Sequence, residues 1–447
     1  MPTLHWIGKD KVINHHQDVP FRILEKQYTF SNGEETSDKI SENKIIHGDN
    51  LEALKSLLPS YEGIIDFIYI DPPYNTGEEN WIYNDNVSDP RLKQWLGQVV
   101  GKENEDLSRH DKWLCMMYPR LKLLEKLLSD KGIIFISIDD NELFNLKLML
   151  DEIFGSNSFV TNFSWEKRTN RENRKVISSR HESVLCYSKA KYFTDVINKL
   201  QMSEEALQRY QNPDLDYRGL WKSDPATAQA GHATASQFYT LIAPNGKKHL
   251  PPSGRCWLYT EKVMQEKIAN NEIWFGKHGN NVPRIKTYLN AKERGLTAES
   301  IIFASVGGTN ESSKKQIKEI FKNEASFITP KPTSLIEYLI RLGSKKDSII
   351  LDSFAGSGTT AHAVLNLNKD GGNRKFILIE MEDYADSITA ERVKRVINGY
   401  GEGNKSVEGT GGSFSYYTLD KPIFLENDML NEEVKCPHFT RPLLRVS

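Results

Sequence analysis

Residues 64–70, IIDFIYI, form a short apolar run that is rich in β-branched side chains, and the sequence DPPY follows it directly. Such a run is typical of a strand buried on both faces, which occurs mainly in parallel sheets. Pro72 and Pro73 end the strand because proline lacks a backbone donor and has a fixed φ. The chain is therefore predicted to carry a stiff loop, Asp71 to Tyr74, at the carboxyl end of a central strand, where open α/β sheets bind ligands. An ordinary strand-ending turn is the alternative, although it would not require the tyrosine.

Strand-like and helix-like segments alternate on both sides of a less regular middle region. The predicted strands are residues 45–47, 64–70, 133–138, 183–188, 349–351, 375–379 and 413–419. The predicted helices are residues 51–58, ended by Pro59, then 111–129, 143–153, 333–342, a helix running to Leu367, and 386–396. This alternation indicates βαβ units and an α/β fold with a mostly parallel sheet. Between about residues 190 and 325, polar segments with Gly and Pro predict an inserted domain.

Composition restricts the class of protein. A chain of 447 residues with 38% hydrophobic and 26% charged residues is typical of a soluble globular protein of two or three domains. It has no apolar stretch long enough to cross a bilayer, and its first ten residues lack a signal-peptide pattern. The four cysteines are scattered, which indicates neither a disulfide framework nor a zinc site. We therefore expect a cytoplasmic protein without a metal centre.

The segment 165–180, WEKRTNRENRKVISSR, is locally basic although the whole chain has a net charge of −2. The candidate phosphate-binding residues in it are Lys167, Arg168, Arg171, Arg174 and Lys175. Interleaved Asn and Ser side chains also suit phosphate contacts. A solvated charged loop explains the same pattern equally well.

A second signal is the glycine turn DSFAGSG, residues 352–358, which lies between a predicted strand and a predicted helix. Glycine lets the backbone approach a ligand closely, and an acidic residue at the tip of the next strand typically binds ribose hydroxyls. Glu380 has that position. The turn departs from G-x-G-x-x-G, which disfavours NAD, and the chain has no G-x-x-x-x-G-K-[ST] motif, which disfavours ATP hydrolysis.

Together, the DPPY and FAGSG motifs resemble those of amino-methylating DNA methyltransferases that use S-adenosylmethionine. DPPY precedes the insert and FAGSG follows it, an order similar to the permuted β class of these enzymes. Residues 48–50, GDN, resemble the cofactor-adenine motif, and Lys331-Pro332 resembles the segment before the glycine turn. The segments HWIGKDKVINHHQDVPFRIL and GTNESSKKQIKEIF resemble the modification (Mod) subunits of type III restriction systems and their solitary relatives.

The resemblance implies a Rossmann-like sheet of seven strands with an inserted target-recognition domain. The expected parts are an N-terminal arm (1–44), the catalytic half (45–189), the insert (190–325), the cofactor-binding half (326–420) and a tail (421–447). For this family the insert is short and the chain ends early, which leaves open whether the enzyme is solitary or works with a restriction subunit.

The resemblance also implies roles for individual residues. Catalysis is expected from Asp71, Pro72, Pro73 and Tyr74. Cofactor contacts are expected from Asp49, Asn50, Asp71, Lys331, Asp352, Ser353, Phe354, Ala355, Gly356, Gly358, Thr359 and Glu380. Trp81 and Tyr83 either line the base pocket or pack in the core, and His110 and His181 are interpreted as structural. Asp139 and Asp140 are interpreted as turn residues.

Asp at the first position of the tetrapeptide favours adenine over cytosine, by resemblance. The expected partners are double-stranded DNA and, in some relatives, a restriction subunit or a second copy of the chain. Two alternatives stay open: an amine methyltransferase acting on RNA or protein, and a catalytically silent DNA-binding subunit. The basic segment and the large insert favour a long polyanion over a small substrate.

Overall fold

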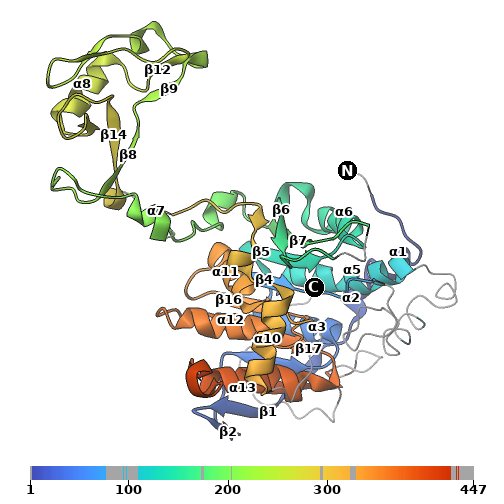
Figure 1. Ribbon diagram of the computed structural model, residues 1–447. Helices are drawn as coiled ribbons and strands as arrows, with labels where there is room; N and C mark the ends of the chain where they lie inside the picture. Colours follow the sequence, from blue (N-terminus) through green and yellow to red (C-terminus); the bar gives the residue numbers. More distant parts are fainter. Residues whose placement is uncertain are drawn as a thin grey trace. The chain divides into compact units, whose positions relative to one another are not determined.

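The computed structural model describes residues 3–76, 94, 97, 109–172, 176–202, 204–291, 295–322, 329–423, 429 and 431. The chain divides into two compact units (Figure 1). We call Met1–Asn198 with Glu299–Ser447 the sheet unit, and Lys199–Ala298 the insert unit. The insert unit is narrower at both ends than the predicted insert, because residues 299–322 fold with the sheet unit.

The elements of the sheet unit before the insert are α1 (Lys9–Val12), α2 (His15–Asp18), β1 (Arg22–Ser31), β2 (Glu34–Thr36), β3 (Lys44–His47), α3 (Asn50–Tyr61), β4 (Ile65–Ile70), α5 (Arg109–Leu127), β5 (Leu128–Ile138), α6 (Leu143–Phe154), β6 (Phe159–Glu166) and β7 (His181–Ser188). Those after it are β15 (Ile301–Ile302), α9 (Ala304–Gly307), α10 (Asn310–Ile320), α11 (Thr333–Gly343), β16 (Ile349–Asp352), α12 (Thr359–Asn368), β17 (Lys375–Glu380), α13 (Glu391–Asn398), β18 (Gly399–Tyr400), β19 (Val407–Glu408) and β20 (Ser413–Pro422).

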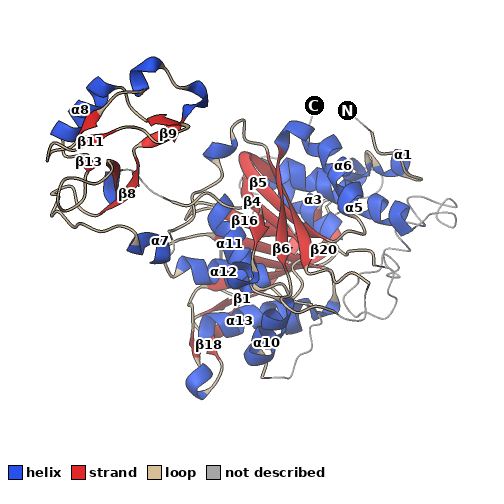
Figure 2. Ribbon diagram, turned by 45° about the horizontal axis from the view of Figure 1, so that its top comes forward, coloured by secondary structure: helices blue, strands red, loops and turns tan. Residues whose placement is uncertain are grey.

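The described strands of the sheet unit form one sheet of eleven strands in the order β15-β6-β7-β5-β4-β16-β17-β3-β20-β1-β2. All neighbours from β5 through β20 pair in parallel. Helices cover both faces, with α11 and α12 on one and α3, α5 and α6 on the other (Figure 2). The fold is the expected α/β fold with a mostly parallel sheet. Its central strand β4 is apolar on both faces, with Phe67 and Ile68 fully buried.

Three details differ from the sequence prediction. Residues 1–44 add strands to the sheet, because β1 pairs with β20 and β2 pairs with β1, and the described sheet has eleven strands where the resemblance implied seven. Strand β7 runs antiparallel to both β5 and β6. Helix α3 continues past Pro59 to Tyr61. A proline in the last turn of a helix removes only one hydrogen bond there, so the helix need not end at it.

The insert unit consists of α7 (Glu204–Gln208), β8 (Trp221–Pro225), β9 (Thr227–Gln229), β10 (Leu241–Ile242), β11 (Lys248–His249), β12 (Arg255–Trp257), α8 (Glu261–Ala269), β13 (Ile273–Trp274) and β14 (Arg284–Tyr288). These strands form small antiparallel sheets around a core that includes Leu241, Trp257 and Met264. No helix in the described parts of the chain has the length and hydropathy needed to span a bilayer.

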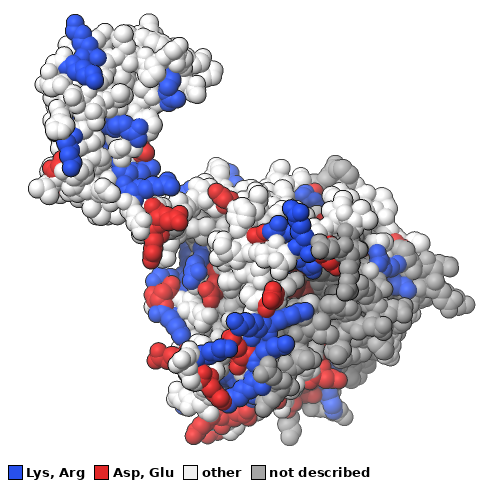
Figure 3. Space-filling view, viewed as in Figure 1, with Lys and Arg blue, Asp and Glu red and all other residues white. Residues whose placement is uncertain are grey.

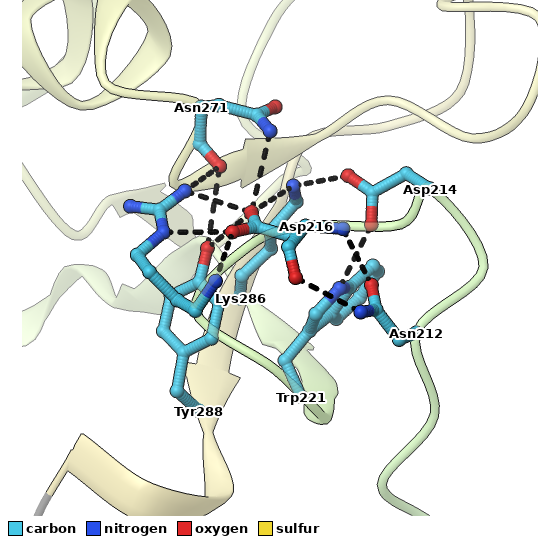
Figure 4. Close-up of polar contacts among 8 residues, drawn as sticks. Asn212, Asp214, Asp216, Trp221, Asn271, Lys286 and Tyr288 are labelled. Atoms are coloured by element: carbon cyan, nitrogen blue, oxygen red, sulfur yellow. Dashed lines mark hydrogen bonds and ion pairs between the residues drawn. The ribbon is translucent and has the colours of Figure 1, made fainter.

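A buried polar cluster joins β14 to the loop before β8 (Figure 4). The Asp216 carboxylate accepts hydrogen bonds from Lys286 Nζ at 2.9 Å and Tyr288 Oη at 2.8 Å, and its side chain has 0% exposure. Arg218 donates to both oxygens of the same carboxylate, at 2.9 and 2.8 Å. Lys286 also pairs with Asp214, which accepts from the Trp221 indole. The loop is thereby held against β14 by charge-assisted hydrogen bonds.

Candidate active site

The parallel strands β4, β16, β17 and β3 end at the same edge of the sheet, and this places the predicted motifs side by side. Leu351 of β16 pairs with Ile68 of β4, three residues before Asp71. Asp352 pairs with Leu378, and Glu380 pairs with His47. The DPPY loop therefore neighbours the glycine turn, which in turn neighbours Glu380 and the GDN motif, at the carboxyl ends of the strands, where open α/β sheets bind ligands.

The DPPY loop is held by hydrogen bonds from buried groups. The indole of Trp113, on α5, donates to the carbonyl of Pro73 at 2.6 Å. Asn75 follows in a left-handed conformation (φ 58°), fully buried, and donates to the carboxylate of Glu142. Glu142 also pairs with His110 Nδ1 at 2.6 Å, a contact that fits the structural role expected for this histidine. These contacts preorganise the loop.

Asp71 lies in a compact network of charged and polar groups. Lys331 Nζ contacts its two carboxylate oxygens at 2.8 and 2.7 Å, and Tyr74 Oη donates to Oδ1 at 2.8 Å. Glu182, on β7, accepts from Tyr74 Oη at 3.2 Å and lies 3.6 Å from Lys331 Nζ. Its other oxygen pairs with Lys167 Nζ at 3.0 Å. Lys331 therefore contacts the DPPY loop directly in this structure.

Sequence analysis did not identify Glu182, which directly precedes the predicted strand 183–188. Because β7 runs antiparallel to β5, its amino end lies at the edge where the parallel strands have their carboxyl ends. An acidic residue at the start of an apolar strand was the available signal, but strand direction could not be inferred from it.

Burial and charge act in opposite directions on the two carboxylates. Burial raises the pKa of Asp71, and the ammonium group of Lys331 only partly opposes this. Burial would also raise the pKa of Glu182, but Lys331 and Lys167 outweigh it and lower that pKa. Burial raises the pKa of Tyr74 far above its ordinary value, so its hydroxyl stays protonated and can donate.

The glycine turn has the geometry of a close ligand approach. Gly356 and Gly358 have φ values of 52° and 79°, in the left-handed region that favours glycine. The Gly356 amide donates to Glu380 Oε2 at 2.7 Å, and the Glu382 amide donates to Oε1 at 3.0 Å. Burial raises the pKa of Glu380 to about 7.

Asp352 lies at the start of the turn and stabilises it. Its carboxylate accepts from the Phe354 amide at 3.0 Å and from the Thr360 hydroxyl at 2.5 Å. Its side chain is buried, and burial raises its pKa to about 7. These contacts give Asp352 a local structural role beside any cofactor contact.

The GDN motif adjoins the turn from the other side. Asp49 caps α3 by accepting from the Leu51 and Glu52 amides. Asn50 donates to the carbonyl of Ser353 at 3.2 Å and accepts from the buried guanidinium of Arg120. The helix start, the turn and α5 are thus joined by one polar network.

Two pockets open at this edge and share Asp71 and Phe354. The first is lined by Asn50, Asp71, Pro73, Met116, Arg120, Ser353, Phe354, Glu380, Met381, Glu382 and Tyr384. The second is lined by Tyr69, Asp71, Thr329, Pro330, Lys331, Asp352, Phe354, Ala355, Gly356, Ser357, Thr359 and Thr360. The residues that were predicted to contact a cofactor thus gather around these pockets, apart from Asp49 and Gly358, which line neither.

Comparison with known proteins agrees with this arrangement. Residues 65–391 match the sequence profile of a DNA methylase family. The chain belongs to this DNA methylase family. It is 36% identical to the type III restriction-modification enzyme StyLTI Mod subunit of Salmonella typhimurium, over 90% of this chain and 64% of that subunit. It is 33% identical to the type II methyltransferase M.KpnI of Klebsiella pneumoniae, over 76% of this chain and 80% of the relative.

The predicted resemblance to type III Mod subunits is thereby confirmed, although the chain spans just under two thirds of the StyLTI Mod subunit. Among solved structures, the PvuII DNA methyltransferase (cytosine-N4-specific) matches with a TM-score of 0.41 and 15% sequence identity, over 79% of this chain and 87% of that one.

The residues that line the two pockets of this DNA methylase suit S-adenosylmethionine in their chemistry. The hydroxyl of Ser353 is buried and has no hydrogen-bond partner among the described residues, so it is available to a ligand. Carboxylates of Asp71 and Glu380 suit a sulfonium cation and ribose hydroxyls, and Phe354 and Met381 supply apolar contacts. The donor set therefore matches a molecule that combines a cation, a sugar and an aromatic base.

A basic cleft of about 930 Å³ lies between the end of β6 and α10. Its cationic residues are Lys167, Arg168, Arg171, Lys314, Lys315 and Lys318. Figure 3 shows Lys and Arg side chains gathered on the face that carries α10. The three lysines of α10 were missed as binding residues because they lie about 140 residues from the predicted basic segment. Arg174, Lys175, Trp81 and Tyr83 lie outside the described residues.

Proposed function

We propose that this DNA methylase transfers a methyl group from S-adenosylmethionine to the N6 amine of an adenine flipped out of double-stranded DNA. The observation that carries the proposal is the Asp71 carboxylate, held on a stiff loop where the two pockets meet. The proposed setting is a restriction-modification system or a solitary epigenetic enzyme of the cytoplasm. Similarity to the StyLTI Mod subunit supports the first setting.

The residues of the loop suit this chemistry. The exocyclic amine of adenine is a poor nucleophile because its lone pair is delocalised into the ring. Asp71 and the carbonyl of Pro72 would accept the two N–H bonds and direct the lone pair toward the methyl donor. The N–C bond would form as the S–C bond of the donor breaks, and the proton lost by the amine would pass to the carboxylate of Asp71 and from there to solvent. S-adenosylmethionine supplies the methyl group when bound.

Cofactor contacts are assigned by position in the two pockets. Glu380 and the hydroxyl of Ser353 would hold ribose hydroxyls, and Asn50 lies in the same pocket beside the place for the adenine. The backbone of the glycine turn lines the second pocket and would border the methionine portion. Tyr74 would stack on the flipped base and offset part of the unstacking energy.

The charge distribution supports a polyanionic substrate. Residues 199–298 contain 14 Lys and Arg against 9 Asp and Glu, a net charge of +5, whereas the remainder of the chain has 44 against 51, a net charge of −7. The sheet unit also has a basic surface, because lysines of α10 line the basic cleft. Duplex DNA, read by the insert unit and held by phosphate contacts, is therefore the proposed substrate.

Methyl transfer from tritiated S-adenosylmethionine tests the proposal, with long unmethylated duplex DNA, RNA and a protein mixture as acceptors. Labelling of DNA alone, with N6-methyladenine after digestion to nucleosides, is the expected result. N4-methylcytosine would contradict the base assignment, and labelling of RNA or protein would contradict the substrate class. Absence of transfer together with retained DNA binding would favour the silent subunit.

A variant pair connects the activity to the loop. Asp71→Ala should lower the transfer rate by about 10²–10³-fold, whereas Asp140→Ala, which changes an exposed aspartate after a neighbouring strand, should leave the rate unchanged. Co-purification with a restriction subunit and light scattering for a homodimer test the two proposed protein partners.

A further inference from the structure

In this structure Lys331 contacts Asp71 and Tyr74, the two side chains that the proposed reaction requires. Its ammonium lies 2.8 and 2.7 Å from the Asp71 oxygens, where the target amine would donate. It also lies 4.9 Å from the ring centre of Tyr74, over the face of the ring. The ammonium thus takes one acceptor site on each carboxylate oxygen and Tyr74 takes a second on Oδ1, so withdrawal of the ammonium frees acceptor sites and space for an adenine amine.

A second carboxylate is placed to receive it. Glu182 Oε2 lies 3.6 Å from Lys331 Nζ and 3.2 Å from Tyr74 Oη. Closing that gap to the usual ion-pair distance of about 2.8 Å needs a shift of less than about 1 Å. Lys331 directly precedes Pro332, the N-cap residue of α11. A rotation of the lysine side chain alone can produce a shift of this size without movement of the backbone.

Glu182 also connects this network to the basic cleft. Its side chain is 7% exposed, and its other oxygen pairs with Lys167, which lines the cleft. A buried carboxylate is costly without a cationic partner. If a DNA phosphate attracts Lys167 away, Glu182 must compensate with the nearest other cation of the network, which is Lys331.

We propose that Glu182 is a positioning residue that draws Lys331 off Asp71 when a DNA phosphate engages Lys167, so that DNA in the basic cleft frees the acceptor for the target amine. This inference rests on the proposed function. It assigns Glu182 no contact with the reacting atoms. In the second arrangement Glu182 exchanges one lysine for another, and Asp71 exchanges an ammonium for the N–H groups of a neutral amine that becomes positively charged as it accepts the methyl group.

Glu182→Gln tests the inference, because it keeps the shape of the side chain and removes its charge. Lys331 should then stay on Asp71, and kcat at saturating DNA should fall between about tenfold and 10²-fold, as for a misplaced reacting group. The KM values for DNA and S-adenosylmethionine should change little. Glu182→Asp, which restores the charge at a shorter reach, should recover part of kcat.

The pH profile separates this role from a structural one. The groups facing Glu182 are Lys331 before α11, Lys167 after β6, Tyr69 on β4, Tyr74 and Asp71 on the loop after β4, and Asp139 after β5. The charge of Glu182 contributes to the raised pKa of Asp71. Glu182→Gln should therefore move the acid limb of the kcat profile to lower pH. A purely structural defect would lower kcat without moving that limb.

Lys167→Met and Arg168→Met form a matched pair in the cleft, because Arg168 pairs with Glu172 rather than with Glu182. Both should raise the KM for DNA, and kcat should fall in neither variant because both keep the charge of Glu182; only Lys167→Met, which leaves Glu182 to Lys331, should raise kcat. An unchanged kcat in Glu182→Gln, or a fall in kcat in Lys167→Met as large as in Glu182→Gln, would overturn the inference.

The outcomes also separate this inference from the proposed function, because a wild-type chain without methyl transfer to DNA would contradict the function itself. Should Glu182→Gln fail to fold, Glu182→Asp carries the test, and a wild-type kcat in that variant would count against the inference.

Discussion

The two units of the molecule each contain a buried cluster made from an aspartate, a lysine and a tyrosine. In the sheet unit these are Asp71, Lys331 and Tyr74. In the insert unit they are Asp216, Lys286 and Tyr288 (Figure 4). The residue types match, yet the surroundings give the two carboxylates opposite properties.

The difference lies in the number of donors and in access to a pocket. Asp216 receives two additional bonds from Arg218, its side chain has 0% exposure, and these hydrogen bonds lower its pKa. Asp71 retains 14% exposure and lines both pockets, and burial raises its pKa. A carboxylate whose acceptor sites are all used holds a loop in place, whereas a partly exposed one that lines a pocket can exchange its partner for a ligand.

Lys286→Met should have the largest effect and should act on stability. It removes the cation between Asp214 and Asp216 and leaves buried negative charge, which costs about 3–5 kcal/mol. Chemical denaturation of the full chain should show early loss of the insert unit. The affinity for S-adenosylmethionine should stay the same, because the cofactor pockets lie in the sheet unit; a loss of that affinity would break the comparison.

Asp71→Ala should affect chemistry rather than stability. Loss of a preorganised charge-assisted acceptor should lower the methyl-transfer rate by about 10²–10³-fold. Unfolding should change much less than in Lys286→Met, because Glu182 remains beside Lys331. The check is the transfer rate set beside the denaturation midpoint. A variant that unfolds but transfers methyl groups normally would show that Asp71 is a structural residue like Asp216.

Two glycines, one in each unit, extend the comparison to the backbone conformation. Gly358→Ala should cost about 1–2 kcal/mol for a side chain at φ 79°, and its Cβ would also lie 3.0 Å from the carbonyl of Thr389. Gly246→Ala in the insert unit, at φ 88° with nothing within 4 Å, bears the conformational cost alone. The denaturation midpoints should differ accordingly, and only Gly358→Ala should weaken cofactor binding. Equal effects on cofactor affinity would count against the turn as a ligand site.

The smallest expected effect is the pH dependence of stability. The pKa of Glu380 is raised to about 7 from an ordinary 4.5, so the folded state binds more protons than the unfolded state across that range. This group therefore makes the free energy of unfolding fall as pH rises from about 4.5 to about 7. The slope corresponds to a difference of less than one bound proton between the folded and the unfolded state. Glu380→Gln should flatten this fall in thermal unfolding profiles.

The carboxylate of Asp216 makes stability depend on pH in the opposite direction. Its pKa lies below its ordinary value of 3.8, so its contribution is present above that pH and is lost on acidification. Asp216→Asn should thus remove stability at pH 7 but little at low pH. Parallel slopes in the Glu380→Gln and Asp216→Asn variants would contradict the assigned environments.

Local patterns were sufficient for much of the fold. The apolar runs that became β4, β16 and β17 were predictable because a strand buried on both faces leaves a continuous signal in the sequence. The two motifs at strand ends were predictable as neighbours, because parallel strands share a carboxyl edge. Family membership followed from the motifs and from their order.

The sequence by itself thus determined the sheet class, the stiff acidic loop and the glycine turn, because each depends on residues close together in the chain. Only the tertiary structure decided that antiparallel β7 brings Glu182 to the site and that Lys331 contacts Asp71, 260 residues away in sequence. Strand direction and side-chain partners depend on contacts between distant segments, and no local periodicity records them. For that reason the loop was predictable from its residues, whereas the ion pair between Lys331 and Asp71 was not.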